Sequence, residues 1–348
     1  MVLIKKQNNK TNVSIQLLRF LLCFWVVIIH CTYVKPKYKK YMFRGFHVPT
    51  FIFIAFYFYY PLLSKRNIIK IISRFQRLLI PYLLWPIIQL IILHLSLKKF
   101  KFGVMNFINQ LSLKKIYLQI LIGTQIYGIF WFQFNLIFLS LFFTIVSFMF
   151  KKSFLIILQF IGIISLYLRA SQLDYYFFIS FSKYISANLA SLIELIPNAA
   201  IGCSLSHINF LIKIKNIPNY YKFMLALFAF IFFKYDIFLH LNGYRYTDVF
   251  LHMVMSIILF TLFGCIDLDK LKCMKPIINQ LSGFTGGIYC IHLIIKNLLI
   301  KNFEFFNNGN NKTYFFSILI YILSYFICFI GYKLFENHNL KYILIYCF

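Results

Sequence analysis

Residues 15–33 read IQLLRFLLCFWVVIIHCTY, an apolar segment that holds one arginine and one histidine. A helix rises ~1.5 Å per residue, so a segment of this length reaches nearly across the ~30 Å apolar core of a bilayer. The segment is too long for the apolar region of a signal peptide, and charged sequence at 35–40 follows it in place of a cleavage site. We therefore expect a membrane-spanning helix that the mature protein retains.

The whole chain has the composition of a membrane protein. Of its 348 residues, 61% are hydrophobic and 13% are charged, and the mean hydropathy is +0.78. One soluble core could not bury so much apolar surface. The predicted fold is an all-α, polytopic membrane helix bundle that forms a single integral domain over residues 1–348, so any chemistry must take place inside the bundle. About ten transmembrane helices are expected, at 15–33, 46–63, 78–97, 129–149, 153–169, 189–206, 223–240, 249–265, 280–300 and 313–332.

The net charge of +28 comes from lysines and arginines in short runs between the apolar segments. These runs form no aromatic-basic module of the kind that binds nucleic acid, so the anionic headgroups of the lipid bilayer are the expected partner. Five positive charges and no acidic residue lie at 64–77, which favours the cytoplasmic side for that loop and for the N-terminus. We expect a multi-pass protein of the cell membrane, plasma or inner.

The eight cysteines are scattered along the chain without the close pairs that metal ligands form. We interpret them as small apolar packing residues. The sequence therefore predicts neither a disulfide framework nor a metal site.

Arg19 and His30 are the first candidates for chemistry. Eleven helical steps turn within about 20° of three full turns, so both residues line one stripe, ~16 Å apart along the axis. A cation and an imidazole are costly inside a bilayer, and such residues default to a functional hypothesis. Arg19 either snorkels to lipid phosphates or holds an anionic group. His30 either makes an interhelical hydrogen bond or, as a neutral ring, accepts a proton from a hydroxyl.

Two further basic features lie close behind in the sequence. His47 begins the second apolar segment, where it either approaches His30 across a helix interface or is a plain interfacial histidine. Arg74 and Arg77 are three residues apart and so share a helix face. They either snorkel at the membrane boundary or bind a phosphate-rich ligand.

Later segments add a carboxylate and a second polar pair. Glu194 lies within an apolar segment, where a carboxylate is seldom without a partner, and Arg19 or a substrate hydroxyl is a candidate. Tyr289 and His292 are three residues apart on one face of the helix that follows a glycine pair.

Several of these segments together resemble the acyltransferase-3 family of integral membrane acyltransferases, over nearly the whole chain. Many members of that family have Ser-Gly-Phe where this chain has Ala55-Phe56-Tyr57, and the hydrolase-like domain appended to some members is missing. The resemblance rests on the arginine, ten residues, histidine spacing of the first helix, and on FHVPTFIFIAF at 46–56, RFQRLLIPYLLW at 74–85, WFQFNLIFL at 131–139 and IYCIHLII at 288–295.

The resemblance implies an O-acyltransferase that moves an acyl group, usually acetyl, from acyl-CoA to a hydroxyl of a carbohydrate or lipid-linked glycan. Acyl-CoA is then a co-substrate, and no cofactor is bound permanently. The implied catalytic residues are His30 and Arg19, with His30 taking the hydroxyl proton or transiently carrying the acyl group. Arg74 and Arg77 join Arg19 in binding the anionic donor. Candidates for contact with the carbohydrate or glycolipid acceptor, or for a supporting role, are His47, Trp131, Glu194, Tyr289 and His292.

A different class of function fits the same bundle. A polar stripe among ten helices can also form the pathway of a non-enzymatic transporter or exporter of a polysaccharide or lipid-linked sugar. The two hypotheses differ in one simple property, because such a transporter has no reason to bind acyl-CoA.

Overall fold

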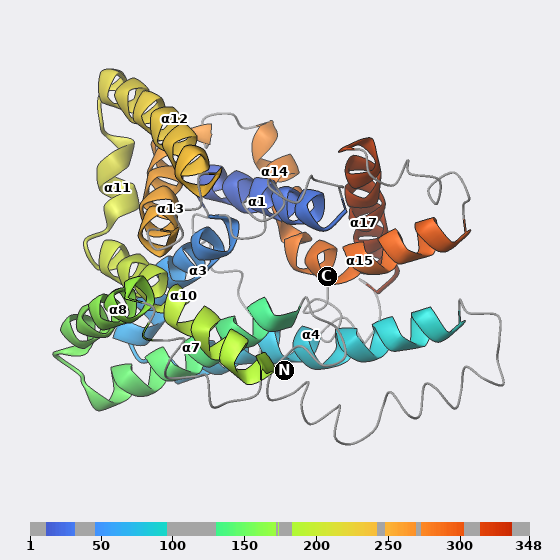
Figure 1. Cartoon of the computed structure of the whole chain (residues 1–348), viewed down its shortest axis with the longest axis horizontal. Coiled ribbons are helices and arrows are strands. Elements are labelled where there is room, and N and C mark those ends of the chain that lie inside the picture. Colours follow the sequence, from blue (N-terminus) through green and yellow to red (C-terminus); the bar gives the residue numbers. More distant parts are fainter. Residues whose placement is uncertain are drawn as a thin grey trace.

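The computed structural model describes residues 12–31, 46–95, 130–171, 173, 183–241, 248–268, 273–302 and 314–335, which contain helices and no strand. The predicted all-α class is confirmed for this part of the chain (Figure 1). The helices are α1 (Val13–Cys31), α3 (His47–Ser64), α4 (Ile68–Leu95), α7 (Trp131–Met149), α8 (Phe154–Ala170), α10 (Lys183–His207), α11 (Phe210–Lys215), α12 (Asn219–Leu241), α13 (Asp248–Cys265), α14 (Met274–Gly283), α15 (Thr285–Asn302) and α17 (Tyr314–Phe335).

Every segment expected to cross the membrane overlaps a helix, but fewer than ten meet the length and hydropathy of a span. Within the described residues, five helices are long and apolar enough, and a bent pair makes a sixth. The stretches 154–170 in α8 and 249–265 in α13 are apolar but short. At 17 residues, α8 reaches only ~26 Å, less than the ~30 Å apolar core. The membrane bundle is confirmed, and the count of ten stays a prediction.

The segment at 280–300, expected as one span, is broken in the structure. α14 ends at Gly283, and α15 begins at Thr285 with a bend of 55° between them. The ring of Phe284, at the break, packs edge-on against three aromatic rings of α17 with centroids 5.6 to 6.3 Å away. This aromatic anchor fixes the bend, and the bend allows both α14 and α15 to pack along α1.

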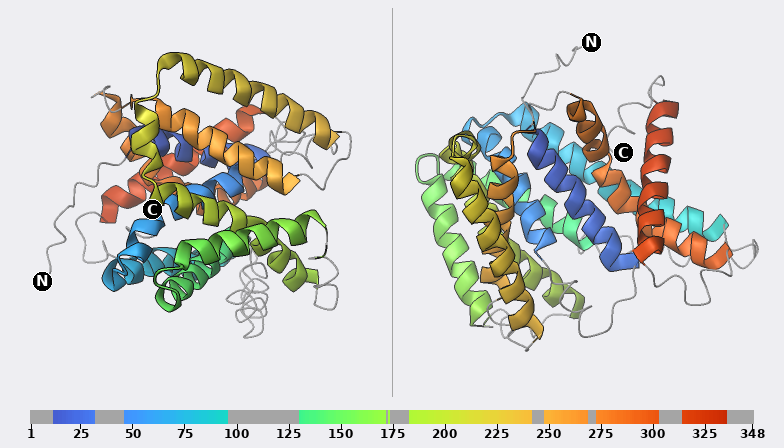
Figure 2. Two further views of the ribbon diagram at one scale, coloured as in Figure 1. Left: turned by 90° about the vertical axis from the view of Figure 1, so that its left-hand side faces the viewer. Right: turned by 90° about the horizontal axis from the view of Figure 1, so that it is seen from above.

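α1 lies at the centre of the bundle (Figure 1). It packs against α3 and α13 on one side and against α14, α15 and α17 on the other. α12 runs beside α13 at the outside of the bundle, as both views of Figure 2 show. The central position of α1 means that its two polar residues meet several other helices rather than lipid alone.

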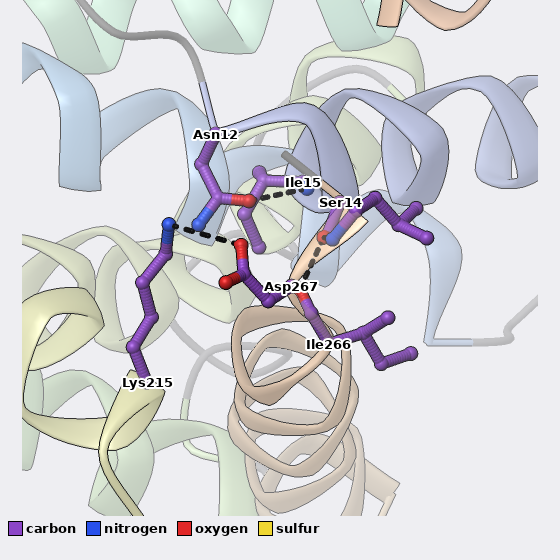
Figure 3. Close-up of polar contacts among 7 residues, drawn as sticks. Asn12, Ser14, Ile15, Lys215, Ile266 and Asp267 are labelled. Atoms are coloured by element: carbon purple, nitrogen blue, oxygen red, sulfur yellow. Dashed lines mark hydrogen bonds and ion pairs between the residues drawn. The ribbon is translucent and has the colours of Figure 1, made fainter. Parts of the chain in front are cut away.

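The first turn of α1 is tethered to the α13–α14 connection (Figure 3). The Asn12 side chain accepts a hydrogen bond from the backbone N–H of Ile15, at 3.2 Å, as helix-capping residues do. Ser14 Oγ donates to the carbonyl oxygen of Ile266 at 2.5 Å, and the adjacent Asp267 carboxylate lies 3.8 Å from Lys215 Nζ. These contacts place the start of α1 and the end of α11 on one face of the bundle.

α3 and α10 approach each other with almost no side chain between their backbones. A Cβ added to Gly202 would lie 2.5 Å from the carbonyl oxygen of Phe53 and 3.2 Å from the amide nitrogen of Tyr57. The close approach of the two backbones therefore depends on the absence of a side chain at Gly202.

We expect Gly202→Ala to destabilise the protein by ~1–3 kcal/mol, because the added methyl group forces two packed backbones apart. Thermal unfolding of the purified protein in detergent measures the effect. Gly283→Ala is the matched control, since a Cβ there would meet no atom within 4 Å. Equal stability of the two variants would contradict the close approach.

Candidate active site

Four histidines from four helices form one group inside the bundle, which we call the histidine group. The rings of His30 on α1 and His292 on α15 have centroids 5.4 Å apart. His47 on α3 lies within electrostatic range of His30 and of His252 on α13. His47, His252 and His292 are all buried, with at most 5% of each exposed. The expected approach of His47 to His30 is therefore present in the structure.

His292 presents an open nitrogen to this group. Its Nδ1 lies 3.2 Å from the carbonyl oxygen of Ile288, which can only accept, so Nδ1 carries the proton in this contact. In a neutral ring Nε2 then keeps its lone pair, and Nε2 is buried with no hydrogen-bond partner in the described part of the chain. Such a nitrogen can accept a proton from a hydroxyl.

Side chains of neighbouring helices bond to the backbone near the two histidines. Lys296 Nζ donates to the carbonyl oxygen of His30 at 2.5 Å, which satisfies a terminal carbonyl of α1 and brings a cation to the histidine group. Gln89 Nε2 of α4 donates to the carbonyl oxygen of Cys290 at 2.6 Å, and Gln89 is fully buried. These bonds join α1, α4 and α15 at the level of the rings.

A second polar group, Arg19 and Arg74, lies elsewhere in the bundle, and we call it the arginine group. The Arg74 guanidinium stacks over the Tyr59 ring of α3, 4.1 Å from its centroid, and lies within electrostatic range of Arg19. Arg19 is half-buried and donates to Gln16 Oε1 at 2.9 Å. Arg74 Nε is buried without a hydrogen-bond partner in the described segments. Two cations held together inside an apolar bundle suit an anionic ligand.

Arg77 differs from Arg74 although the two are one turn apart. Arg77 is exposed, and its Nε donates to the carbonyl oxygen of Ser73 on its own helix at 3.3 Å. Its charge still reaches Arg74. Arg77 therefore contributes to the positive potential at this end, while Arg74 is the half-buried member of the pair.

The two groups lie at different depths. Arg19 and His30 are eleven residues apart on α1, which corresponds to ~16 Å along the helix. α3 repeats this spacing, because His47 belongs to the histidine group and Tyr59 stacks on the arginine group, with twelve residues or ~18 Å between them. Two helices thus carry the same two polar layers, separated by about half the apolar thickness of a membrane.

A comparison of the sequence with protein-family models identifies the family of this chain. The acyltransferase-3 model, described as an acyltransferase domain, matches residues 12–333, nearly the whole chain. The chain belongs to the acyltransferase-3 family. The resemblance predicted from the sequence is confirmed, and the protein is a membrane acyltransferase. Neither the curated proteins nor the solved structures gave a match to it.

Some candidate residues of the acyltransferase lie beside the histidine group and one does not. The Tyr289 ring lies 6.2 Å from the His292 ring and 5.7 Å from Phe132, the neighbour of Trp131. Trp131 itself is half-buried at the start of α7 and reaches the group only through Phe132. Glu194 forms an ion pair with Arg169 of α8 at 3.4 Å.

Arg19, one of the two partners suggested for Glu194 from the sequence, is not the cation beside it. Arg19 bonds to Gln16 and lies within electrostatic range of Arg74, and the other suggestion, a substrate hydroxyl, stays a prediction. Arg169 stands in the last turn of α8, and α8 packs along α10. Helix packing, which the sequence pattern does not reveal, decides which cation neutralises this carboxylate.

Three residues of the acyltransferase site were not predicted as such. His252 is a lone imidazole in the apolar sequence of α13, so the rule that drew attention to His30 would also have found it. Lys296 was visible as a cation within an apolar segment. Gln89 had no signal of its own, because an uncharged polar residue is common in such helices, and only its bond to the Cys290 carbonyl reveals its position.

Metal ligands are not gathered anywhere in the described part of the acyltransferase. No three side chains of histidine, cysteine, aspartate or glutamate are placed there so that they could hold an ion. Six of the seven cysteines in the described segments are buried, and all seven are free thiols. Their burial agrees with the predicted packing role.

Proposed function

We propose that this acyltransferase moves an acyl group, acetyl in the simplest case, from acyl-CoA to a hydroxyl of a carbohydrate or lipid-linked glycan. The observation that carries the proposal is the pair His30 and His292. Their rings lie 5.4 Å apart, and one of them presents a buried nitrogen that has no hydrogen-bond partner in the described segments. A thioester is already activated, so the protein must supply position, a base and stabilisation of an oxyanion.

The arginine group binds the donor in this proposal. Acyl-CoA carries several phosphates, which match the guanidinium groups of Arg19 and Arg74 and the nearby charge of Arg77. A long, neutral arm separates these phosphates from the thioester. The ~16 Å between the arginine and histidine groups leaves room for this arm to extend from one layer to the other.

At the histidine group the hydroxyl oxygen of the acceptor attacks the thioester carbonyl carbon. His30 takes the proton of that hydroxyl as the new C–O bond forms, with His292 beside it. The C–S bond then breaks, and the imidazole returns the proton to the leaving thiolate, so that CoA and the acylated acceptor are the products. The cation of Lys296 lies near enough to stabilise the negative charge that develops on the carbonyl oxygen.

The same scheme assigns an orientation. The start of α1 and residues Lys215 and Asp267 share one face, and Arg19 is five residues, or ~8 Å, beyond Ser14. We place this face in the cytoplasm, where acyl-CoA is made, and the protein in the cell membrane. The histidine group then lies towards the outer half of the bilayer.

Binding of acetyl-CoA tests the proposal against the transporter hypothesis. We expect acetyl-CoA at ~100 times its Kd to stabilise the detergent-solubilised protein by ~2.7 kcal/mol, because a ligand that binds only the folded state shifts unfolding by mass action. ATP at the same concentration is the control for non-specific binding of phosphate. Failure of acetyl-CoA to raise the unfolding temperature above the ATP control would contradict the assigned donor.

A further inference from the structure

Two asparagines, Asn135 on α7 and Asn198 on α10, are unusual in the bundle. Both are completely buried. Neither the amide nitrogen nor the carbonyl oxygen of either side chain has a hydrogen-bond partner in the part of the chain that is described. Buried carboxamides without partners reduce stability, and native proteins rarely keep them without a reason.

Asn198 lies close in depth to the histidine group. Cys203 Sγ of α10 lies 3.8 Å from the carbonyl oxygen of Phe56 on α3. One turn further along both helices, His207 Nδ1 lies 2.8 Å from the Tyr60 hydroxyl. The two helices therefore run parallel. Counting back five residues on each helix places Asn198 at the level of Phe51, about one turn from His47.

Asn135 occupies the same layer. The Phe132 ring lies 6.0 Å from the Phe51 ring, and further along the same pair of helices the Phe143 ring lies 4.7 Å from Phe56. α7 therefore also runs parallel to α3. Asn135 is three residues after Phe132 and so within one turn of the level of Phe51. α7 and α10 pack against each other, so the two carboxamides belong to contacting helices and lie at similar depth.

Aromatic rings connect this region to the histidine group. Phe132 lies between Phe51, at 6.0 Å, and Tyr289, at 5.7 Å, and Tyr289 is 6.2 Å from the ring of His292. Aromatic side chains therefore lie between the level of the carboxamides and His292, the neighbour of the proposed base His30. Such rings suit the C–H faces of a sugar, and carboxamides suit the hydroxyls at its edge.

We propose that Asn135 and Asn198 form a hydrogen-bonding subsite for hydroxyl groups of the acceptor. The inference rests on the proposed acyl transfer and adds the residues that hold the acceptor. A carboxamide donates through Nδ2 and accepts through Oδ1, so it matches a hydroxyl, which does both. It carries no charge and thus does not match the phosphates of the donor, for which the arginines at the other layer are suited.

The neutral arm of acyl-CoA offers the same chemistry, because it contains amides and a hydroxyl. The acceptor and the donor arm are therefore two possible ligands of the asparagines, and they are distinguished by which substrate a variant fails to bind. If the asparagines hold the acceptor, their replacement leaves the stabilisation by acetyl-CoA intact. If they hold the donor arm, that stabilisation falls together with transfer.

The test uses Asn135→Leu and Asn198→Leu, which keep the number and branching of the side-chain heavy atoms and remove the buried polar atoms. Cells that lack the native gene are complemented with the full-length wild type or a variant, and their membranes, which contain the natural acceptor, receive [1-14C]acetyl-CoA. We expect each variant to transfer at least ~10-fold less label to membrane glycans and lipids than the wild type, since a buried hydrogen bond to substrate is lost. Each purified variant should unfold at the wild-type temperature or above and keep the full acetyl-CoA shift.

Ser324→Ala is the matched control, because Ser324 is also fully buried but bonds to the Ile320 carbonyl of its own helix. The Ser324→Ala variant should transfer as much label to membrane glycans and lipids as the wild type. Transfer within twofold of wild type in both asparagine variants would overturn the subsite, and so would loss of the acetyl-CoA shift. If the wild type itself transfers no label and gains no stability from acetyl-CoA, the proposed function fails and the subsite falls with it.

Discussion

Replacing His30 with alanine is expected to lower acyl transfer by ~10²–10⁴-fold, the usual contribution of a positioned general base. His30 is the residue that takes the hydroxyl proton in the proposed mechanism, and its ring centroid lies 5.4 Å from that of His292. His292→Ala should cause a comparable loss, because Nε2 of His292 is the open nitrogen beside it. Release of CoA from acetyl-CoA by the purified protein, supplied with membrane lipids that contain the acceptor, measures the rate.

The matched control for these variants is His207→Ala. His207 is an exposed histidine at the end of α10, where Nδ1 lies 2.8 Å from the Tyr60 hydroxyl, and it is not a member of the histidine group. It should keep the wild-type rate. Turnover by His30→Ala at the rate of His207→Ala would remove His30 from the mechanism, whatever the effect of His292→Ala.

Replacing Arg74 with alanine is expected to weaken the binding of acetyl-CoA by ~10–100-fold, as loss of charge-assisted hydrogen bonds to a phosphate usually does. Arg74 is half-buried, and its guanidinium lies over the Tyr59 ring. The concentration of acetyl-CoA that gives half of the maximal thermal stabilisation reports the affinity. The stability of the unliganded variant is measured in the same experiment.

Lys70→Ala serves as the control for Arg74→Ala, because Lys70 is an exposed cation one turn earlier on α4. Its removal changes the net charge equally and should leave the affinity almost unchanged. Arg77→Ala should have an intermediate effect, since Arg77 is exposed but its charge reaches Arg74. Equal affinities of the Arg74 and Lys70 variants for acetyl-CoA would contradict the assignment of the arginine group to the donor.

Much of the architecture could be predicted from the sequence, because it depends on local properties such as the length of apolar segments. Apolar runs of sufficient length predict helices in a membrane, and each predicted segment does overlap a helix. The break at Phe284 was not predicted, because it depends on three rings of α17 that are distant in the sequence. Mean hydropathy is an average over a window of residues, so it does not reveal a bend within an apolar segment.

The candidate site was only partly readable for a similar reason. Charged and titratable residues stand out in apolar helices, which is why Arg19, His30 and His292 were identified. Arg169 was not predicted as the cation beside Glu194, because that contact depends on helix packing. The buried asparagines were not predicted, because an uncharged side chain has no such contrast. Their importance lies in the absence of hydrogen-bond partners in the described segments, which no sequence pattern encodes.

The sequence alone determined that this protein is an all-α membrane protein, and the motifs along it placed it in its family. It also determined that Arg19 and His30 share a stripe of the first helix at two depths, since helix geometry follows from the chain itself. Only the tertiary structure decided that His30 contacts His292, that Glu194 pairs with Arg169, and that Arg19 lies within electrostatic range of Arg74. These pairs join residues on different helices, and contacts between helices depend on the packing of the whole bundle.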